Sequence, residues 1–234
     1  MSGYYDFISF QKYTIGYGAL RDIRRITYGM GERYLILHDY HCRGAVNERI
    51  RESLTMSKSD AVNITADNLV GRQPGLMDNL PGEEKLVPAE VEFCQVENKV
   101  CSCQAARKVG KQIVEYHPDI VVAVGGAKCQ DLVRAALHYV DRYKRPKLVL
   151  CPTVLSSNAS ATGMSVIYDE TTGKMVDFWN LAYMPECQIV DTEILIETPA
   201  DTLVSGIGDQ VASSIEALHT IKRIGEWKIC DPLC

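Results

Sequence analysis

The chain has 234 residues, enough for one large domain or two small ones, and its 46% apolar and 24% charged residues are ordinary for a globular protein. Its formal net charge of -5 argues against nucleic acid or an anionic membrane as the main partner, because both favour basic patches. No segment has the roughly 18 apolar residues needed to cross a bilayer, and residues 1–10 lack the pattern of a secretory signal.

The N-terminal part of the chain predicts a strand followed by a helix. Before them, the local cluster of Arg21, Arg24 and Arg25 is interpreted as a solvated helix face, the usual place for a run of like charges. The apolar run at residues 34–38 (YLILH) predicts a buried strand that ends at Asp39. Residues 45–54 have the periodicity of a helix.

The next segment has the weakest periodicity in the chain. Residues 60–65 are compatible with another strand. Residues 67–92 contain Pro and Gly and favour a long loop or an irregular insertion.

Regular alternation resumes at Ser102, which is placed to cap a helix over the next dozen residues. The run IVVAV at residues 120–124 predicts a strand, residues 131–143 a helix, and residues 147–151 (KLVLC) another buried strand. This β-α-β-α-β order predicts a parallel sheet covered by helices on both faces.

After Pro152 the pattern changes. Residues 164–168 and 174–179 predict a hairpin with its turn at Gly173, and residues 189–191 predict a short strand. Residues 205–224 predict one long amphipathic helix. We therefore place a domain change near residue 190, with an α/β domain over residues 1–190 and the first helices of a second, incomplete domain over residues 191–234.

The nine cysteines indicate a reducing compartment rather than a disulfide-linked scaffold. Cys129, Cys151 and Cys187 lie within or beside apolar segments, where a free thiol behaves as a small hydrophobe. The pairs at 101/103 and 230/234 lack the spacing of a zinc site, so we expect no structural zinc from them and a cytoplasmic protein.

The strongest local motif is VVAVGGAKCQDLVRA at residues 121–135, a buried strand, a Gly turn and the start of a helix. Gly125 and Gly126 lack a Cβ, so a pyrophosphate can approach their N–H groups at the positive end of the helix. Lys128 adds a point charge. The alternative interpretation is a tight strand-to-helix turn without a ligand.

Taken together, these segments resemble the glycerol dehydrogenase branch of the iron-containing alcohol dehydrogenase and dehydroquinate synthase superfamily. The resemblance rests on six segments, in the family's order: YTIGYGAL at 13–20, the strand ending in Asp39, GGAK with Asp131, CPTVLSSNASATGMSVIY at 151–168, QIVDT at 188–192 and GIGDQVASSIEA at 206–217. It implies a parallel-sheet nucleotide-binding domain followed by the start of an all-α metal-binding domain.

The resemblance also implies roles for individual residues. Asp39 would bind the adenosine ribose of NAD, and Gly125, Gly126, Lys128 and Asp131 would form the pyrophosphate loop. The nicotinamide side would be lined by Thr153, Ser156, Thr162, Met164 and Tyr168. Asn158 would contact the substrate, and Asp209 would be the first ligand of a divalent metal, zinc or iron, with Glu216 further along the same helix. Asp39 favours NAD over NADP, since a carboxylate repels a 2′-phosphate.

The sequence departs from the family pattern at three positions near these residues. Ala127 replaces the third Gly of the loop, Asn158 replaces an Asp that binds the polyol, and Ser160 replaces a Pro. The family's histidine metal ligands lie beyond Asp209, whereas His219 would stand about 15 Å away along one helix, too far to share an ion. Three explanations stay open: a truncated chain, a naturally shortened nucleotide-binding protein without catalysis, or a homo-oligomer whose partner completes the site. We favour truncation, because the apolar stripe of the helix at 205–224 is expected to pack against further helices.

Three functions stay open on the sequence. The first is an NAD-dependent, metal-requiring dehydrogenase of a small polyol or alcohol. The second is a catalytically inactive nucleotide-binding or oligomerisation protein. The third is an enzyme similar to glycerol-1-phosphate dehydrogenase or dehydroquinate synthase, which would need a basic cluster that residues 152–168 lack.

Overall fold

The computed structural model describes residues 12–42, 44–55, 87–96, 100–181 and 184–224 of the chain. A six-stranded sheet forms its centre, in the order β1-β8-β5-β4-β2-β3, and every pair of neighbouring strands is parallel. The strands are β1 (Lys12–Gly16), β2 (Arg33–His38), β3 (Glu90–Gln95), β4 (Ile120–Gly125), β5 (Lys147–Pro152) and β8 (Cys187–Asp191). The predicted α/β fold with a parallel sheet is confirmed.

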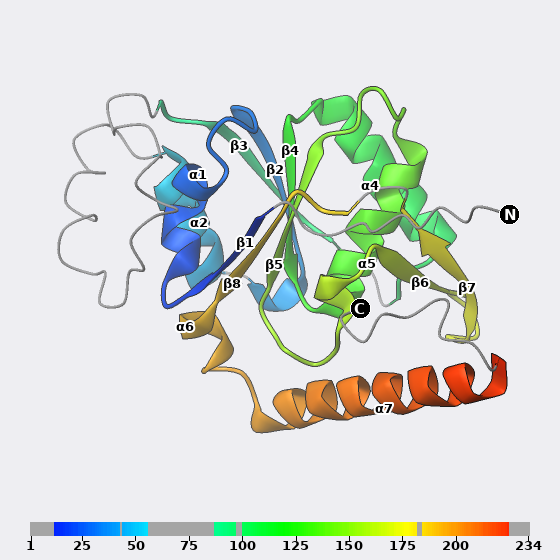
Figure 1. Cartoon of the computed structure of the whole chain (residues 1–234). Helices are drawn as coiled ribbons and strands as arrows, with labels where there is room; N and C mark the ends of the chain where they lie inside the picture. The colour runs from blue at the N-terminus through cyan, green and yellow to red at the C-terminus, as the bar shows by residue number, and fades with distance from the viewer. Residues whose placement is uncertain (1–11, 43, 56–86, 97–99, 182–183, 225–234) are drawn as a thin grey trace, which may run out of the picture.

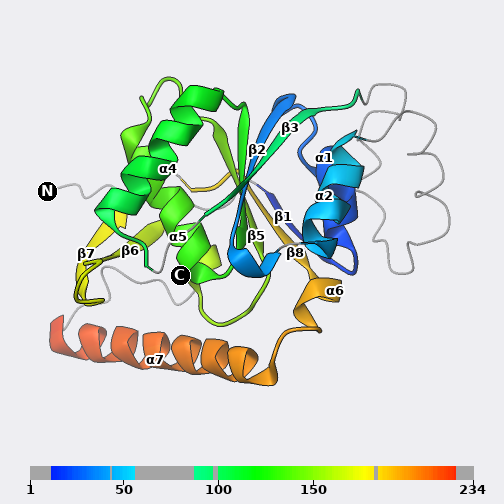
Figure 2. The ribbon, with the colours of Figure 1, turned by 180° about the vertical axis from the view of Figure 1, so that it is seen from behind.

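Helices cover both faces of this sheet (Figures 1 and 2). Helices α1 (Ile23–Ile26) and α2 (Ala45–Thr55) pack on one face, and α4 (Cys103–Tyr116) and α5 (Ala127–Ala136) pack on the other. Side chains of one strand alternate between the two cores, so every residue of β4 is buried. This explains why IVVAV is apolar at consecutive positions rather than at every second one.

Strand β3 was not predicted, because the sequence favoured a loop up to residue 92. It pairs with β2 from Arg33↔Glu90 to His38↔Gln95 and lies at the edge of the sheet. Its sequence EVEFCQ alternates, with exposed Glu90 and Glu92 on one face, so it lacks the apolar run of the central strands. The possible strand at 60–65 lies outside the described residues.

The boundaries of α5 differ from the predicted helix at 131–143. The helix begins directly after Gly126 and ends at Ala136, followed by a 3-10 turn at Leu137–Tyr139. Val140 is extended (φ -104°, ψ 134°), which ends the helical path before Tyr143. The other predicted helix of this region is confirmed: Ser102 caps α4, and its Oγ accepts a hydrogen bond from the amide of Ala105 at 3.1 Å.

The C-terminal part adds a hairpin and a long helix. Strands β6 (Met164–Tyr168) and β7 (Met175–Asn180) pair in antiparallel fashion, and Gly173 has a φ of +66° in the turn, as predicted. After the short helix α6 (Thr192–Leu195), α7 (Ala200–Ile224) runs below the carboxyl ends of the sheet strands (Figure 1). Among the described residues, none of the helices combines the length and apolar character needed to cross a bilayer. The domain boundary near residue 190 stays a prediction.

Helix α7 carries the predicted apolar stripe, and the described part of the chain leaves it exposed. Ile207, Val211, Ile215 and Leu218 are each more than half exposed (57%, 54%, 58% and 55%). These four residues follow i, i+4, i+8 and i+11 spacing and therefore share one face of the helix. The predicted long amphipathic helix is present, and the part of the chain that the structure describes leaves its apolar stripe more than half exposed.

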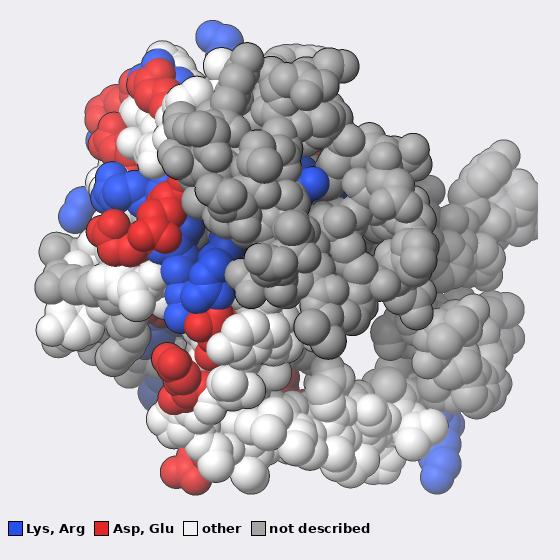
Figure 3. Space-filling view, turned by 90° about the vertical axis from the view of Figure 1, so that its left-hand side faces the viewer, with Lys and Arg blue, Asp and Glu red and all other residues white. Residues whose placement is uncertain are grey.

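The interpretation of the arginine cluster as a solvated face is wrong for Arg24. Its side chain is only 4% exposed. The guanidinium donates to the Val87 carbonyl at 3.0 and 3.2 Å and to the Tyr34 hydroxyl at 3.2 Å, and it forms an ion pair with Glu32. On this side of the molecule basic and acidic groups are interspersed (Figure 3). Arg21 and Arg49 both form ion pairs with Glu193. Arg21 and Arg24 of this cluster therefore bind neighbouring segments of their own chain.

Asp191 at the end of β8 joins the first and last strands of the described fold. Its carboxylate is 1% exposed and accepts hydrogen bonds from the amides of Gly18 (2.9 Å), Leu20 (3.0 Å) and Glu193 (3.0 Å). It thus caps α6 and fixes the turn that follows β1.

We expect Asp191→Ala to lower the free energy of unfolding by about 3 kcal/mol, because three amides lose their acceptor in a buried place. Urea denaturation measures this change. Asp201→Ala, at an exposed position in the first turn of α7, serves as the control and should change stability by less than about 1 kcal/mol. Equal effects of the two substitutions would contradict this role of Asp191.

Candidate functional site

The strand order creates a switch point between β2 and β4, which are neighbours in the sheet. After β2 the chain enters α2 on one face, and after β4 it enters α5 on the other face. The two connections therefore diverge from the carboxyl ends of adjacent strands. In open α/β sheets this is where ligands bind. The residues that follow β2 and end β4 are Asp39 and the Gly125–Gly126 turn.

Asp39 and the Gly turn are in direct contact. The amide of Gly126 donates to Asp39 Oδ2 at 3.1 Å, and the amide of Cys42 donates to Oδ1 at 3.2 Å. Gly125 has a φ of +157°, and a Cβ there would lie 2.5 Å from Asp39 Oδ2 and 2.8 Å from the Cys129 Cβ. Only glycine fits between the carboxylate and the start of α5. The structure thus brings together three residues that the sequence placed at one cofactor.

The N-terminus of α5 has the properties of an anion site. The first amides of a helix have no intrahelical acceptor, and the helix dipole adds positive potential there. Gly126 N already donates to Asp39, so the amides of the following residues are the donors left for a phosphate. Lys128 is exposed at the same end. A pyrophosphate of a dinucleotide fits this arrangement.

The segment after β5, which we call the β5–β6 loop (residues 153–163), starts beside this turn. The amide of Thr153 donates to the Gly125 carbonyl at 3.2 Å, and the Cys42 thiol lies 3.5 Å from Thr153 Oγ1. Burial raises the pKa of Cys42 to about 12, so its thiol is protonated at neutral pH and is not a nucleophile. Ser156 and Thr162 lie further along the loop and are half-buried.

The three other cofactor candidates lie on elements packed around this loop. Met164 opens β6, and Tyr168 ends that strand beside the start of α4, where its amide donates to the Cys101 carbonyl at 2.7 Å. Asp131 is 6% exposed, and its carboxylate accepts hydrogen bonds from Arg134 (2.9 Å) and from the amide of Val166 (3.2 Å). A contact of Asp131 with a cofactor stays a prediction.

The β5–β6 loop also meets α7, which joins the substrate candidate to the metal candidate. The backbone amide of Asn158 donates to Asp209 Oδ2 at 2.9 Å, and the side-chain nitrogen Nδ2 of Asn158 lies 3.4 Å from Ser213 Oγ. These residues are 51 and 55 positions apart in the chain. The sequence predicted both Asn158 and Asp209 as site residues, and the structure places them in contact. Ser213 was not predicted, since a lone Ser on a helix gives no signal.

Gly206 explains how α7 comes so close to the loop. A Cβ at Gly206 would lie 2.1 Å from the Leu155 carbonyl oxygen, so a side chain at this position would push the helix away. At Gly208, two residues on, a Cβ would meet nothing within 4 Å. The two glycines of the GIGD motif therefore differ, because only the first is required by packing.

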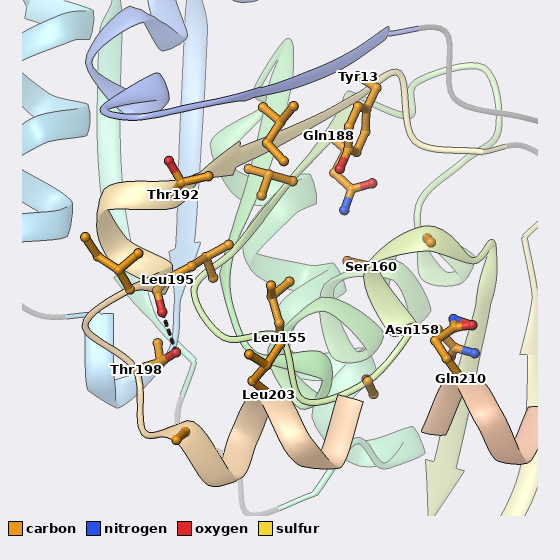
Figure 4. Close-up of a pocket in the computed structure, with 16 residues that line it drawn as sticks. Tyr13, Leu155, Asn158, Ser160, Gln188, Thr192, Leu195, Thr198, Leu203 and Gln210 are labelled. Atoms are coloured by element: carbon orange, nitrogen blue, oxygen red, sulfur yellow. Dashed lines mark hydrogen bonds between the residues drawn. The ribbon is translucent and has the colours of Figure 1, made fainter. Parts of the chain in front are cut away.

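A cavity of about 680 Å³ lies between this loop, α7 and the edge of the sheet formed by β1 and β8 (Figure 4). Leu155 and Leu203 line its floor, while Asn158 and Gln210 lie at one end and Tyr13 and Gln188 come from the strands. The described residues around it offer apolar groups, amides and hydroxyls, with no charged side chain among them. It suits a neutral molecule with a few polar groups.

The described residues do not form a metal site. No group of three or more His, Cys, Asp or Glu that could hold an ion occurs among them. Asp209 contributes one carboxylate, and one of its oxygens accepts the Asn158 amide. Glu216 and His219 are exposed on the same helix, about two and three turns further along. A tetrahedral or octahedral ion needs more protein ligands than Asp209 provides.

Comparison with known protein families matches residues 43–192 to the family described as iron-containing alcohol dehydrogenase. Among curated proteins, the chain is 37% identical over 105 residues to a glycerol dehydrogenase of Thermotoga maritima, covering 45% of this chain and 28% of that protein. It is 32% identical over 164 residues to a glycolaldehyde reductase of Halobacterium salinarum, covering 69% and 42%.

Among solved structures, a probable glycerol dehydrogenase from Sinorhizobium meliloti shares the fold, with a TM-score of 0.66 at 22% identity, and the match covers 89% of this chain and 46% of that one. The chain therefore spans less than half the length of each of these three proteins. The part of the chain that matches the family model, residues 43–192, includes β4 and the β5–β6 loop and ends before α7.

We expect Gly206→Ala to separate α7 from the β5–β6 loop and to destabilise the protein by about 2 kcal/mol, as overpacking does. The hydrogen exchange of the Asn158 amide should become faster, because its acceptor Asp209 moves away. Gly208→Ala is the matched control and should stabilise the helix by about 0.5 kcal/mol. Unchanged exchange at Asn158 in Gly206→Ala would refute the packing argument.

Proposed function

The chain belongs to the iron-containing alcohol dehydrogenase family, and we propose that it forms the NAD-binding part of an oxidoreductase acting on the CH–OH group of a small polyol or alcohol. The observation that supports this most is the contact between Asp39 and the Gly125–Gly126 turn at the switch point of the sheet. Both halves of a dinucleotide site, a carboxylate for the ribose and a helix N-terminus for the phosphates, are present there.

The proposed path of NAD follows the carboxyl ends of three neighbouring strands. Asp39 after β2 accepts the hydroxyls of the adenosine ribose, and the Gly turn after β4, with Lys128, holds the pyrophosphate. The β5–β6 loop and β6 then receive the nicotinamide. The residues proposed for that part are Thr153, Ser156, Thr162, Met164 and Tyr168. The carboxylate of Asp39 favours NAD, because it would repel the 2′-phosphate of NADP.

Bound NAD would supply the redox chemistry by accepting a hydride from the substrate carbon. The residues of this chain would supply positions and exclude water. The side-chain amide of Asn158 can donate to or accept from a substrate hydroxyl. Asp209 holds the backbone of Asn158 through its N–H, and Ser213 contacts the side-chain amide. Leu155 and Leu203 present an apolar surface on one side of the cavity, which would contact the carbon atoms of a bound substrate.

The proposed substrate is uncharged. The described lining of the cavity has no Lys or Arg to bind a phosphate or carboxylate, which disfavours an enzyme of the glycerol-1-phosphate dehydrogenase or dehydroquinate synthase kind. Asn158 replaces the charged residue that the resemblance assigns to polyol binding. We therefore propose a diol or simple alcohol ahead of glycerol.

We propose a divalent metal only for a larger assembly, in which residues other than the described ones supply the remaining ligands. Asp209 would be one ligand, and the others would have to come from elsewhere, because no cluster of metal-binding side chains exists in the part of the chain described. The same finding favours a second candidate, a nucleotide-binding protein of this family without catalysis. Cytoplasmic location and a homo-oligomeric state stay predictions.

We expect NAD to raise the midpoint of thermal unfolding. At a concentration one hundred times the dissociation constant it should stabilise the folded chain by about 2.7 kcal/mol, because it binds only the folded state. A thermal shift titration with NAD, and with adenosine as a weak reference ligand, measures this. No shift at millimolar NAD would contradict the proposed cofactor.

The two candidate functions then separate on metal content and turnover. Stoichiometric zinc or iron together with NAD-linked oxidation of a diol panel would support the dehydrogenase and remove the inactive protein. Binding of NAD without metal and without turnover would support the second candidate for the chain by itself.

We expect Asp39→Asn to narrow the preference for NAD over NADP about tenfold, because the amide keeps a hydrogen-bond acceptor but loses the charge that repels the 2′-phosphate. Isothermal titration with both dinucleotides measures the ratio. Asp201→Asn, at an exposed position on α7, is the charge-matched control and should leave the ratio unchanged. An unaltered ratio in Asp39→Asn would place the adenosine ribose elsewhere.

A further inference from the structure

Arg134, on the last turns of α5, is a fully buried charge that the proposed site does not yet use. It has 0% exposure, although Arg is rarely found fully buried without several partners. Its nearest charged partner is Asp131 on the preceding turn, at 2.9 Å between Nη1 and Oδ1. Such a charge needs an explanation other than a solvated helix face.

The other partners of Arg134 are backbone carbonyls at two ends of one segment. Nη2 donates to the Ala159 carbonyl at 2.7 Å, and Nη1 donates to the Met164 carbonyl. Ala159 directly follows Asn158, and Met164 opens β6. One planar guanidinium therefore connects the middle of the β5–β6 loop to its end.

Asp131 reinforces this connection from the same helix. Its Oδ2 accepts the amide of Val166 at 3.2 Å, and its backbone carbonyl accepts the Ser165 hydroxyl at 2.9 Å. Residues 159–166 are thus fixed to α5 by two neighbouring side chains and one backbone group. The N-terminus of α5 is the proposed pyrophosphate site. The same rigid helix would therefore position both the pyrophosphate and the nicotinamide of the cofactor.

Stability alone does not explain a guanidinium at this position. Burying a charged pair costs much of what its attraction returns, and well-packed apolar residues are often as stable. A guanidinium differs from an apolar side chain and from Lys because its donors form a rigid planar fork. That fork can hold the carbonyls of Ala159 and Met164 at a fixed separation. The reason for an Arg at this position is therefore the geometry of the loop rather than the free energy of unfolding.

We propose that Arg134 is a positioning residue for the nicotinamide half of the cofactor: by holding the carbonyls of Ala159 and Met164, it sets where Thr162, Met164 and Asn158 stand. This inference rests on the proposed function, since it assumes that NAD binds along α5 and the β5–β6 loop. In this proposal, Asp131 pairs with Arg134 and binds the amide of Val166, which holds the guanidinium and the start of β6 in place.

The test compares NAD with ADP-ribose, which has the same phosphates and adenosine but no nicotinamide. In the unmodified chain, NAD should bind more tightly than ADP-ribose. In Arg134→Lys, the dissociation constant of NAD should rise about tenfold and that of ADP-ribose should stay within about twofold, because only the loop loses its second anchor. Arg142→Lys, at an exposed position, is the matched control and should change neither.

A second variant guards against misfolding. The variant Arg134→Gln leaves Asp131 in place and keeps a neutral amide donor at position 134, and its thermal unfolding midpoint shows whether the fold is retained before binding is compared. It should show the same selective loss of NAD. Saturation transfer from protein to the nicotinamide protons should fall in both variants while transfer to the adenine protons persists.

Several outcomes overturn the proposal. Equal weakening of NAD and ADP-ribose in both variants would make Arg134 a structural residue only, and no weakening of either ligand would remove its role. Equal affinities of the two ligands in the unmodified chain would mean that the loop does not hold the nicotinamide. Failure of the unmodified chain to bind either ligand would instead overturn the proposed function itself.

Discussion

The close approach of β2 and β4 at their carboxyl ends depends on a residue without a Cβ at position 125. With φ at +157° and the Asp39 carboxylate 2.5 Å from the place of a Cβ, no other residue keeps the strand, the carboxylate and the helix in their positions. The amide of Gly126 then binds Asp39, and α5 starts at once. The position of the N-terminus of α5 beside Asp39 and the contact of the Thr153 amide with the Gly125 carbonyl both depend on this turn.

The site is assembled by α5 from one side and α7 from the other. The buried guanidinium of α5 binds the carbonyls of Ala159 and Met164. Helix α7 contacts the loop through Asp209, which accepts the backbone amide of Asn158, and through the close approach of Gly206 to Leu155. The loop has little regular structure of its own, so its shape is determined by these two helices. A substitution on either helix that displaces the loop would therefore alter the proposed nicotinamide site, even where the substituted residue does not contact the cofactor.

The sequence predicted the central strands because their residues are buried on both faces and appear as unbroken apolar runs. It missed β3, whose alternating Glu residues reflect an edge position that only the sheet order reveals. The motif residues Asp39, Gly125, Asn158 and Asp209 could be selected by resemblance, but their mutual contacts depend on tertiary packing. Arg24 and Arg134 could not be distinguished from surface charges, because burial of an Arg leaves no periodic signal in its neighbours.

The two kinds of chemistry expected of this family depend on different parts of the protein. The positions proposed for the dinucleotide lie within the α/β sheet and its loops, where hydrogen bonds of 2.7 to 3.1 Å hold the described residues in place. A metal would need further ligands that converge on Asp209, and the apolar stripe of α7 leaves a face on which more protein can pack. Cofactor affinity can therefore be measured on this chain separately from turnover. If NAD binds with the selectivity argued from Asp39, the dinucleotide half of the site is complete whatever completes the metal half.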